Sequence, residues 1–359
     1  MNKEKLKIGI IGIGKFALMS HVPALRATEA AEIAAVSRRN PEKLAIIKRE
    51  LAIPAVYTDW REMLDCSDLD AVLVTTPNGM HAEPTIESLK RGLHVMVEKP
   101  MAIKSEEAES MLRTSESSER ILMVGYSYRF SGACRTAKLR LRDGAIGLIR
   151  QVNVSITGYK RWLFWECDEM PPEIQSLALK VIGMPEEFFD QWKLDGVYHR
   201  KSQDAGGGMY VDVGTHTLDL ALWFADGAPA EVFAMRDNLG HPIECFVTAQ
   251  ARLTNDVLLS ISCADVVSPN LLIPSRNMIE IIGEDGTIFV DLTGDVTINR
   301  DGKSEIVEST IPDQSVCGAF VNAIVNDTEN PSPASEAIHA VRLTEATYRS
   351  IEEKAVITI

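Results

Sequence analysis

Two glycines at a junction between a strand and a helix, Gly12 and Gly14, constrain this chain more than any other feature of its sequence. They follow a short apolar run, and together with Ala17 they fit the pattern G-x-G-x-x-G/A. The first glycine allows a tight turn, the second lets backbone approach a pyrophosphate, and the small third residue lets helix pack on strand. The start of the helix then offers unpaired N–H groups to phosphate. The pattern predicts a dinucleotide site, and we expect Lys15 and Phe16, next on this loop, to contact the cofactor.

Apolar strands and helices alternate over the first part of the chain, and Pro or Gly ends several of the strands. This alternation predicts an α/β domain of the Rossmann type, with a doubly wound parallel sheet, over residues 1–126. The predicted strands are Leu6–Ile13, Ala31–Ser37, Leu69–Thr75, Leu93–Val97 and Ile121–Tyr126. The predicted helices are Lys15–Arg26, Pro41–Glu50, Ala82–Arg91 and one that begins at Ser105.

Short alternating strands joined by polar turns follow, and they predict an α+β domain over residues 127–359. Its sheet is expected to be large, open and mostly antiparallel. An aromatic-rich insertion at about 158–205 interrupts it, either as part of a substrate pocket or as a small local core. The predicted strands are Leu148–Ile156, Glu231–Met235, Cys245–Leu253, Val257–Cys263, Met278–Ile282, Thr287–Leu292, Val296–Asn299 and Ser304–Val307.

The net negative charge of the chain bears on which molecules it can bind. The chain of 359 residues carries a formal net charge of −14, with a pI near 5.1, which argues against a nucleic-acid partner and against an anionic membrane surface. Six scattered cysteines without a C-x-x-C pair, and no apolar run long enough for a signal or membrane segment, lead us to expect a cytoplasmic protein.

Several polar residues follow predicted parallel strands, at the carboxyl edge where ligands bind in doubly wound folds. Glu98 and Lys99 end one strand, and Lys99 is interpreted either as a donor to a substrate oxygen or as a surface lysine. We expect Lys99–Pro100 to be a cis peptide, because an X–Pro bond at a sharp turn has only a small trans preference.

Two further groups lie at the same edge. Thr76, Pro77 and Asn78, with His81 after them, either contact the cofactor or form a turn and a helix cap. Arg129 follows the last parallel strand, where it binds an anion or pairs with a carboxylate.

A glycine-rich turn leads into a helical run with three titratable residues. Asp212, His216 and Asp219 are spaced i, i+4 and i+7, so we expect them on one stripe of an otherwise apolar helix. Such a stripe indicates either a site or a hydrogen-bonded structural cluster. We expect no metal site, because the sequence offers no third ligand group at a suitable spacing.

Taken together, these segments resemble the glucose–fructose oxidoreductase/inositol dehydrogenase (Gfo/Idh/MocA) family. The resemblance implies a Rossmann domain, an open sheet that often makes dimer or tetramer contacts, and NAD(P)-dependent oxidation or reduction of sugars, cyclitols or related polyols. The matching segments are Gly9-Ile-Ile-Gly12-Ile-Gly14, Thr76-Pro77-Asn78 with His81, Glu98-Lys99-Pro100, Tyr128-Arg129-Phe130, and Gly207-Gly208 followed by Asp212, Gly214, His216 and Asp219.

Carried over by position, Lys99, Asp212 and His216 are the catalytic set that this resemblance implies. His216 would take the hydroxyl proton, Lys99 would stabilise the developing alkoxide, and Asp212 would orient the substrate or the imidazole. Two alternatives stay open. One is a glycoside hydrolase that keeps NAD bound and oxidises its sugar transiently, and the other is a nucleotide-binding protein without turnover.

The end of the second strand bears on the choice of cofactor. An NAD site usually has an acidic residue there, bonded to the ribose 2′-OH. This chain instead has Ser37, Arg38 and Arg39, which suit a 2′-phosphate, so we expect NADP to be preferred over NAD.

The open sheet bears on assembly. We expect a homodimer or homotetramer built on that sheet, because its strand Val257–Cys263 is apolar enough on both faces to need cover.

Overall fold

The first sheet contains six parallel strands in the order β3-β2-β1-β4-β5-β6, which is the strand order of a dinucleotide-binding Rossmann domain. It is seen in a computed structural model that describes residues 5–158, 206–240, 244–265, 276–292 and 294–359, so residues 159–205 of the predicted insertion lie outside the described part. The five predicted strands are confirmed, and β3 is an addition at the edge. The strands are β1 (Leu6–Ile11), β2 (Ala31–Ser37), β3 (Ala55–Tyr57), β4 (Ala71–Val74), β5 (His94–Val97) and β6 (Leu122–Val124).

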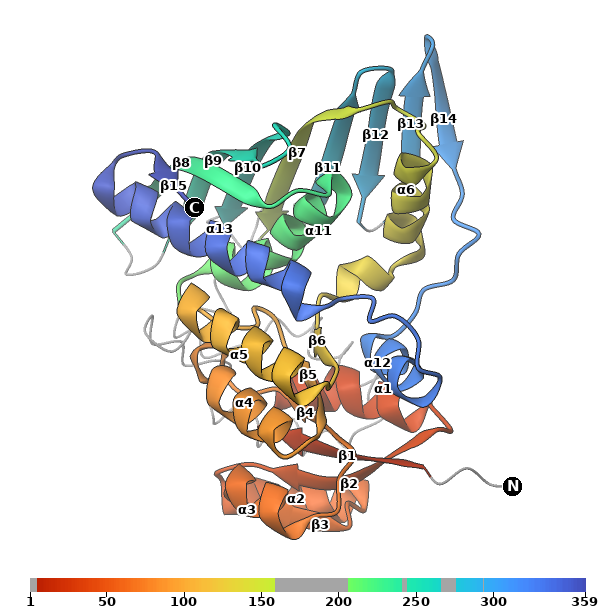
Figure 1. Cartoon of the computed structure of the whole chain (residues 1–359), viewed down its shortest axis with the longest axis vertical. Coiled ribbons are helices and arrows are strands. Elements are labelled where there is room, and N and C mark those ends of the chain that lie inside the picture. Colours follow the sequence, from red (N-terminus) through yellow and green to blue (C-terminus); the bar gives the residue numbers. More distant parts are fainter. Residues whose placement is uncertain (1–4, 159–205, 241–243, 266–275, 293) are drawn as a thin grey trace.

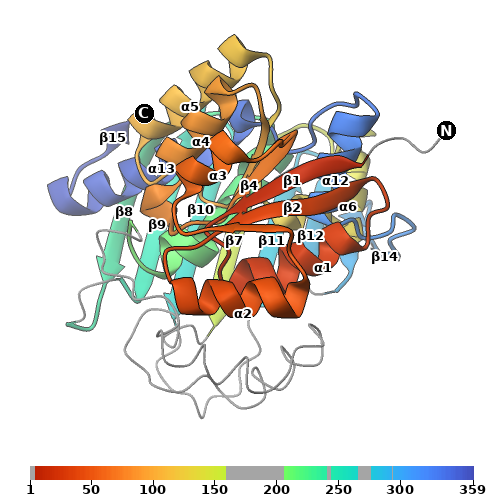
Figure 2. The ribbon, with the colours of Figure 1, turned by 90° about the horizontal axis from the view of Figure 1, so that it is seen from below.

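Helices cover both faces of this sheet, as doubly wound folds require (Figure 2). One face packs on α1 and α2 through an apolar cluster that includes Ile8 and Ile10, and the other packs on α3, α4 and α5 through one that includes Val72 and Val95. Both faces are therefore shielded from water, which explains why these strands are mostly apolar, with polar residues such as Lys7, Glu32 and His94 near their N-terminal ends. The helices are α1 (Val22–Arg26), α2 (Pro41–Leu51), α3 (Trp60–Cys66), α4 (Ala82–Lys90) and α5 (Ser105–Ser118).

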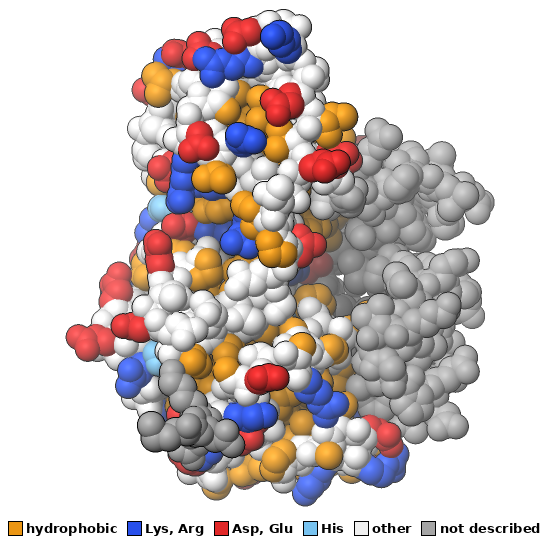
Figure 3. Space-filling view, turned by 90° about the vertical axis from the view of Figure 1, so that its right-hand side faces the viewer, with side chains coloured by type: hydrophobic (Ala, Val, Ile, Leu, Met, Phe, Trp, Pro, Cys, Tyr) orange, Lys and Arg blue, Asp and Glu red, His pale blue; other side chains and the backbone are white. Residues whose placement is uncertain are grey.

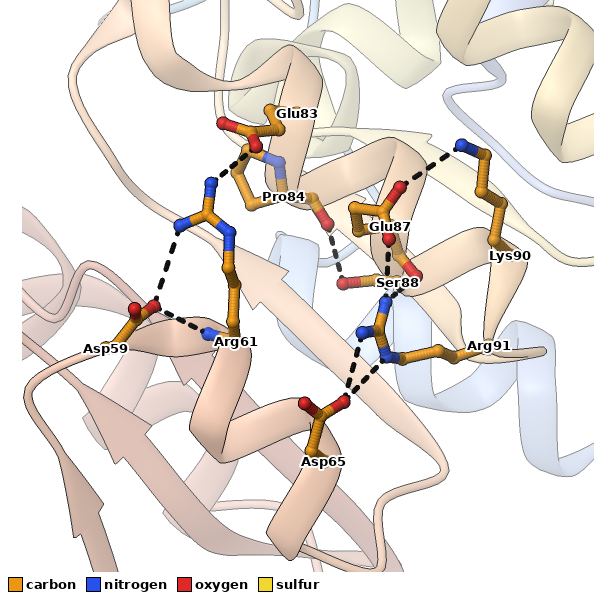
Figure 4. A network of polar contacts seen from close by, with 9 residues as sticks. All are labelled: Asp59, Arg61, Asp65, Glu83, Pro84, Glu87, Ser88, Lys90 and Arg91. Carbon is orange, nitrogen blue, oxygen red and sulfur yellow. Dashed lines mark hydrogen bonds and ion pairs between the residues drawn. The ribbon is translucent and has the colours of Figure 1, made fainter.

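Ion pairs on the outer surface join α3 to α4 (Figure 4). Arg61 pairs with Glu83, and Arg91 pairs with both Asp65 and Glu87. These side chains are well exposed to solvent, which screens such pairs, so each contributes little to stability.

The second sheet contains nine strands in the order β14-β13-β12-β11-β7-β10-β9-β8-β15, and most neighbours are antiparallel. The exception is β7, which lies in the centre and pairs in parallel with β10. The predicted strands are confirmed to within a few residues. They are β7 (Ile149–Gly158), β8 (Pro229–Asp237), β9 (Phe246–Leu253), β10 (Leu258–Asp265), β11 (Arg276–Gly283), β12 (Gly286–Asp291), β13 (Val296–Arg300) and β14 (Lys303–Val307), with β15 (Ile357–Thr358) added at the edge.

Only one face of this sheet is covered by described helices: α6 (Gly132–Arg142), α11 (Thr215–Ala225) and α13 (Ala334–Glu353), as Figure 1 shows. Burial alternates along the strands accordingly, so that β9 turns Val247, Ala249 and Ala251 inward. The opposite face, which we call the open face, is exposed among the described residues. The helix α11 lies between this sheet and the first one, which places its first turns near the first sheet's carboxyl edge (Figure 1).

The chain returns to the first sheet near its end. Helix α12 (Val316–Val325) packs beside α1 and buries Phe320 against the first sheet's apolar cluster. Further on, the Ser332 carbonyl accepts the N–H of Val124, and Pro333 bridges to Met123. The boundary at residue 126 stays a prediction, and these contacts add a C-terminal contribution to the first domain.

The surface carries a mixture of charges. On the side of the molecule that includes β14, α6 and α12, acidic, basic and hydrophobic side chains are interspersed (Figure 3). Within the described ranges, no helix combines the length and the apolar character needed to span a bilayer.

Candidate active site and cofactor edge

The carboxyl ends of β1, β2, β4 and β5 form what we call the cofactor edge. At its centre Gly12 has φ +79°, and a Cβ there would lie 2.8 Å from the Cγ2 of Thr76, so this turn requires glycine. The N–H groups of Gly12 and Ile13 both donate to the Ser37 carbonyl, which fixes the turn to β2. A Cβ on Gly14 would meet no atom closer than 3.5 Å, so the protein itself does not require glycine here. The absence of a side chain leaves the backbone of the loop accessible to a ligand. This geometry fits a pyrophosphate lying against the loop.

The predicted helix after the loop is confirmed, but its first part is a π-helical turn instead of an α-helical one. Residues Ala17–His21 form a π-helical turn, η1, before α1 begins. Lys15 stands at the start of this helix, and burial lowers its pKa to about 8. Phe16 is exposed, with its ring edge-on to that of His21 at 5.2 Å between centroids.

The residues at the end of β2 differ in their surroundings. Ser37 is buried, whereas Arg39 is exposed. Arg38 folds over the glycine loop, where its Nη1 donates to the Ile13 carbonyl at 2.8 Å, and burial lowers its pKa. The cofactor edge therefore carries a guanidinium directly beside the predicted phosphate loop.

The Thr76-Pro77-Asn78 turn stands beside that loop. The hydroxyl of Thr75 donates to the carbonyls of Ile11 and Gly12, so β4 is tied to the glycine turn. Pro77 leads into a short 3₁₀ turn, η2 (Asn78–Met80). His81 is buried behind it, with Nδ1 2.8 Å from the Pro100 carbonyl and Nε2 2.8 Å from that of Thr76. His81 thus joins the turns after β4 and β5 from behind the cofactor edge.

The three predicted catalytic residues come from the turn after β5 and from one helical segment of the second domain. The expected cis peptide at Lys99–Pro100 is confirmed. The Nζ of Lys99 lies 2.9 Å from the carbonyl oxygen of Asp212 and 3.4 Å from its Oδ1. Asp212 lies in a π-helical turn, η4 (Tyr210–Gly214), and His216 lies in the first turn of α11. A π-helical turn is a frequent feature of functional sites.

The surroundings of His216 favour the neutral form of its imidazole. Burial lowers its pKa to about 3, and the positive charge of Lys99 adds to that effect. Its ring lies 4.8 Å from that of Tyr128 and 6.1 Å from that of Tyr126. Its Nδ1 is buried and has no hydrogen-bond partner among the described residues. The uncharged imidazole has a lone pair that can accept a proton, and its low pKa makes it a weak base.

A buried row of three side chains lies behind Lys99, and the sequence indicated only one of them, Glu98, as a site residue. Glu98 is 2.8 Å from Nε2 of His21, whose Nδ1 is 3.2 Å from Sγ of Cys317 on α12. Burial acts to lower the pKa of His21, but its contacts with Cys317 and Glu98 outweigh burial and raise it. The second oxygen of Glu98 accepts the N–H of Lys99 at 3.2 Å. No sequence motif joins these residues, although each stands in an apolar segment where a polar side chain needs a partner.

Of the two roles predicted for Arg129, anion binding and pairing with a carboxylate, the structure shows the second, so Arg129 is not placed among the cofactor contacts. Its buried guanidinium donates two hydrogen bonds of 2.7 Å to Asp219 of α11 and one to Glu336 of α13. Asp219 therefore has a structural partner and stands apart from Asp212 and His216, so the predicted stripe divides into a site and an ion pair. In the described part of the chain, no group of His, Cys, Asp and Glu residues could hold a metal ion.

Sequence comparisons agree with this geometry. The profile of an oxidoreductase family with an NAD-binding Rossmann fold, Gfo/Idh/MocA, matches residues 6–126, and the profile of the Gfo/Idh/MocA C-terminal domain matches residues 182–289. The chain is 25% identical to scyllo-inositol 2-dehydrogenase (NADP(+)) of Bacillus subtilis, over 99% of this chain and 96% of that one. It is 30% identical to 2,7-anhydro-N-acetylneuraminate hydratase of Mediterraneibacter gnavus, over 66% of this chain and 54% of that one.

Among solved structures, aldose-aldose oxidoreductase from Caulobacter crescentus superposes with a TM-score of 0.78 at 24% identity, covering 99% of this chain and 100% of that one. The likeness extends over both sheets and concerns the fold. With the two profiles it confirms the resemblance drawn from the motifs: this chain belongs to the Gfo/Idh/MocA family of oxidoreductases.

Proposed function

We propose that this chain transfers a hydride between NAD(P) and a hydroxyl-bearing carbon of a sugar, a cyclitol or a related polyol. One observation carries the proposal: the lysine that follows β5 lies against a carboxylate on the helical segment of η4 and α11, which also carries a neutral imidazole. The glycine loop of β1 would hold the pyrophosphate of the cofactor, and the nicotinamide would supply the redox chemistry.

Each side chain then has a defined task. His216 takes the proton of the substrate hydroxyl as the hydride leaves the carbon, since its imidazole is uncharged before the reaction. Lys99 stabilises the negative charge that develops on that oxygen. Asp212 directs the Lys99 ammonium through its carbonyl and its carboxylate, so Lys99 is fixed before substrate binds.

The test is a screen of sugars and cyclitols with both cofactors, followed by variants. We expect His216→Ala and Lys99→Ala each to lower turnover by about 10²–10⁴-fold, with dinucleotide affinity nearly unchanged. His339→Ala is the matched control, because His339 lies on α13 and its charged neighbours are Arg342 and Glu336, neither of which is in the catalytic set. Near wild-type turnover by either site variant would remove its assigned role.

The same assay separates the alternatives. A dehydrogenase changes the absorbance of the nicotinamide in proportion to product. A hydrolase that oxidises its sugar transiently leaves no net change, and the relative named as a hydratase makes this control necessary. A binding protein without turnover would give neither signal nor product.

We also infer that the cofactor is NADP rather than NAD. Ser37 ends β2 without an acidic neighbour at that end, and Arg38 and Arg39 follow it. The test is the ratio of kcat/KM for the two cofactors in wild type, Arg38→Ala and Arg39→Ala. A preference for NAD, or a preference for NADP that both variants keep, would contradict the inference.

Self-association through the open face is a further proposal. Phe233, Met235 and Leu258 are large exposed hydrophobic residues there. The expectation that β10 is apolar on both faces is wrong, because Ser260 and Ser262 follow Leu258 on the outward side. The apolar surface is thus centred on β8. A monomeric mass at micromolar concentration, or a dimer that Met235→Arg leaves intact, would contradict this proposal.

A further inference from the structure

Glu244 is a buried carboxylate with no part in the reaction described above. It stands two residues before β9, and its oxygens accept four hydrogen bonds. The N–H of Gly208 lies 2.9 Å from Oε1 and 3.0 Å from Oε2, the N–H of Tyr210 lies 3.1 Å from Oε1, and the Tyr348 hydroxyl lies 2.8 Å from Oε1. Burial raises the pKa of Glu244, and the donors that face its two oxygens oppose that effect by favouring the ionised carboxylate.

Two of these donors, the N–H groups of Gly208 and Tyr210, belong to the turn that starts the catalytic helical segment. The first N–H groups of a helix have no partner within it, and here the Glu244 carboxylate satisfies two of them. Neighbouring side chains pack closely against the backbone of this turn. A Cβ on Gly207 would lie 2.3 Å from the Tyr348 hydroxyl, and one on Gly206 would lie 2.5 Å from Ile103, which follows the cis peptide.

A short path of hydrogen bonds leads from this turn to the catalytic lysine. The carbonyl of Gly208 accepts the N–H of Asp212 at 3.1 Å. The carbonyl of Asp212 in turn accepts the Nζ of Lys99 at 2.9 Å. A shift of the Gly208 turn would therefore change the direction in which Asp212 presents both its oxygens to Lys99.

We propose that Glu244 is a positioning residue for hydride transfer: by holding the Gly208 turn it sets the orientation of Asp212 and, through it, of Lys99. This rests on the proposed function of that site. Tyr348 contributes from α13, so the C-terminal helix takes part in aligning the reaction.

The test is Glu244→Gln, which keeps the shape but places an amide NH₂ at the Oε2 position, facing the N–H of Gly208. A misplacement of about 1 Å at a site costs about 10²-fold in rate, and we expect a loss of kcat of that order. Cofactor affinity, measured by nicotinamide fluorescence, should stay within twofold of wild type because the glycine loop is on the other sheet. The primary deuterium isotope effect on kcat should rise as hydride transfer becomes the slow step. Glu280→Gln is the matched control, since Glu280 bonds Asn153 on the open face.

Gly208→Ala approaches the same contact from the other side, because its Cβ would lie 3.0 Å from the Glu244 carboxyl. We expect the same kinetic signature, and a double variant little worse than either single one, since both remove one interaction. If Glu244→Gln does not fold, Gly208→Ala and the milder Tyr348→Phe carry the test. Wild-type kcat in the variants, or losses that multiply in the double variant, would overturn the positioning role. Absence of hydride transfer by wild type with every polyol would instead overturn the proposed function.

Discussion

Replacing Asp219 by asparagine should lower the free energy of unfolding by about 2–4 kcal/mol, because it leaves the Arg129 guanidinium buried without its main counter-charge. The side chains of Arg129 and Asp219 are 2% and 1% exposed, so water cannot take over the lost interaction. Removing one partner of a buried pair usually costs about 3–5 kcal/mol. Asparagine keeps one oxygen for one of the two hydrogen bonds, and Glu336 remains, so we expect a loss somewhat smaller than the usual one, about 2–4 kcal/mol.

Burial raises the pKa of Asp219, and the charge and hydrogen bonds of Arg129 act against that rise. Burial acts to lower the pKa of Arg129, but the carboxylates of Asp219 and Glu336 outweigh it and raise that pKa. Glu336 stands at the outer end of the cluster with a half-exposed side chain, so Glu336→Gln should cost less than about 1 kcal/mol.

Urea unfolding of both variants against wild type is the assay. The indole of Trp223 lies 5.5 Å from the Arg129 guanidinium carbon and gives a local fluorescence signal. The pair Arg129→Met and Asp219→Leu together should recover most of the loss, since apolar replacement removes the unpaired charge. Equal losses for Asp219→Asn and Glu336→Gln, or a loss below about 1 kcal/mol for the former, would refute the reasoning.

Three other outcomes are expected. Because the pKa of His216 is lowered to about 3, its imidazole stays neutral on acidification, and kcat/KM should show no decline from this group near pH 6.5. In the unfolded chain the same histidine is protonated below about pH 6.5, whereas in the folded chain it is not. The free energy of unfolding should therefore fall as the pH drops below about 6.5. Gly12→Ala should reduce both stability and cofactor affinity, because its Cβ meets Thr76, whereas Gly14→Ala should reduce cofactor affinity alone, as calorimetry and dinucleotide titration would measure. Arg91→Ala, on the solvated surface of Figure 4, should change the free energy of unfolding by less than about 1 kcal/mol.

Most of both sheets could be predicted from sequence because their signals are local. Apolar runs ended by Pro or Gly indicated the buried parallel strands, and alternation with polar turns indicated the antiparallel ones. Lys99 and His216 were found for a similar reason, since each stands beside a recognisable turn or helix start. The small edge strand β3 was missed because three half-buried residues carry almost no periodicity.

The partners of buried polar residues could not be predicted, because they come from distant parts of the chain. Arg129 is 90 positions from Asp219 and 207 from Glu336, and no local pattern chooses between them and an anion. Glu244 stands 36 positions from Gly208 and is a single acidic residue in a turn. The sequence indicates only that such a group needs a partner, and the fold decides which one.

The return of α12 to the first sheet has a practical consequence for anyone who wishes to study cofactor binding in isolation. A fragment that stops at residue 126 would lack Phe320 and would leave apolar surface around Ile8 and Ile10 open to water. It would also leave the edge of β6 unpaired where Ser332 and Pro333 now bond, and an uncovered strand edge promotes aggregation. The dinucleotide-binding unit is thus assembled from two ends of the chain, and a soluble fragment would have to join residues 5–130 to residues 315–333 by a linker.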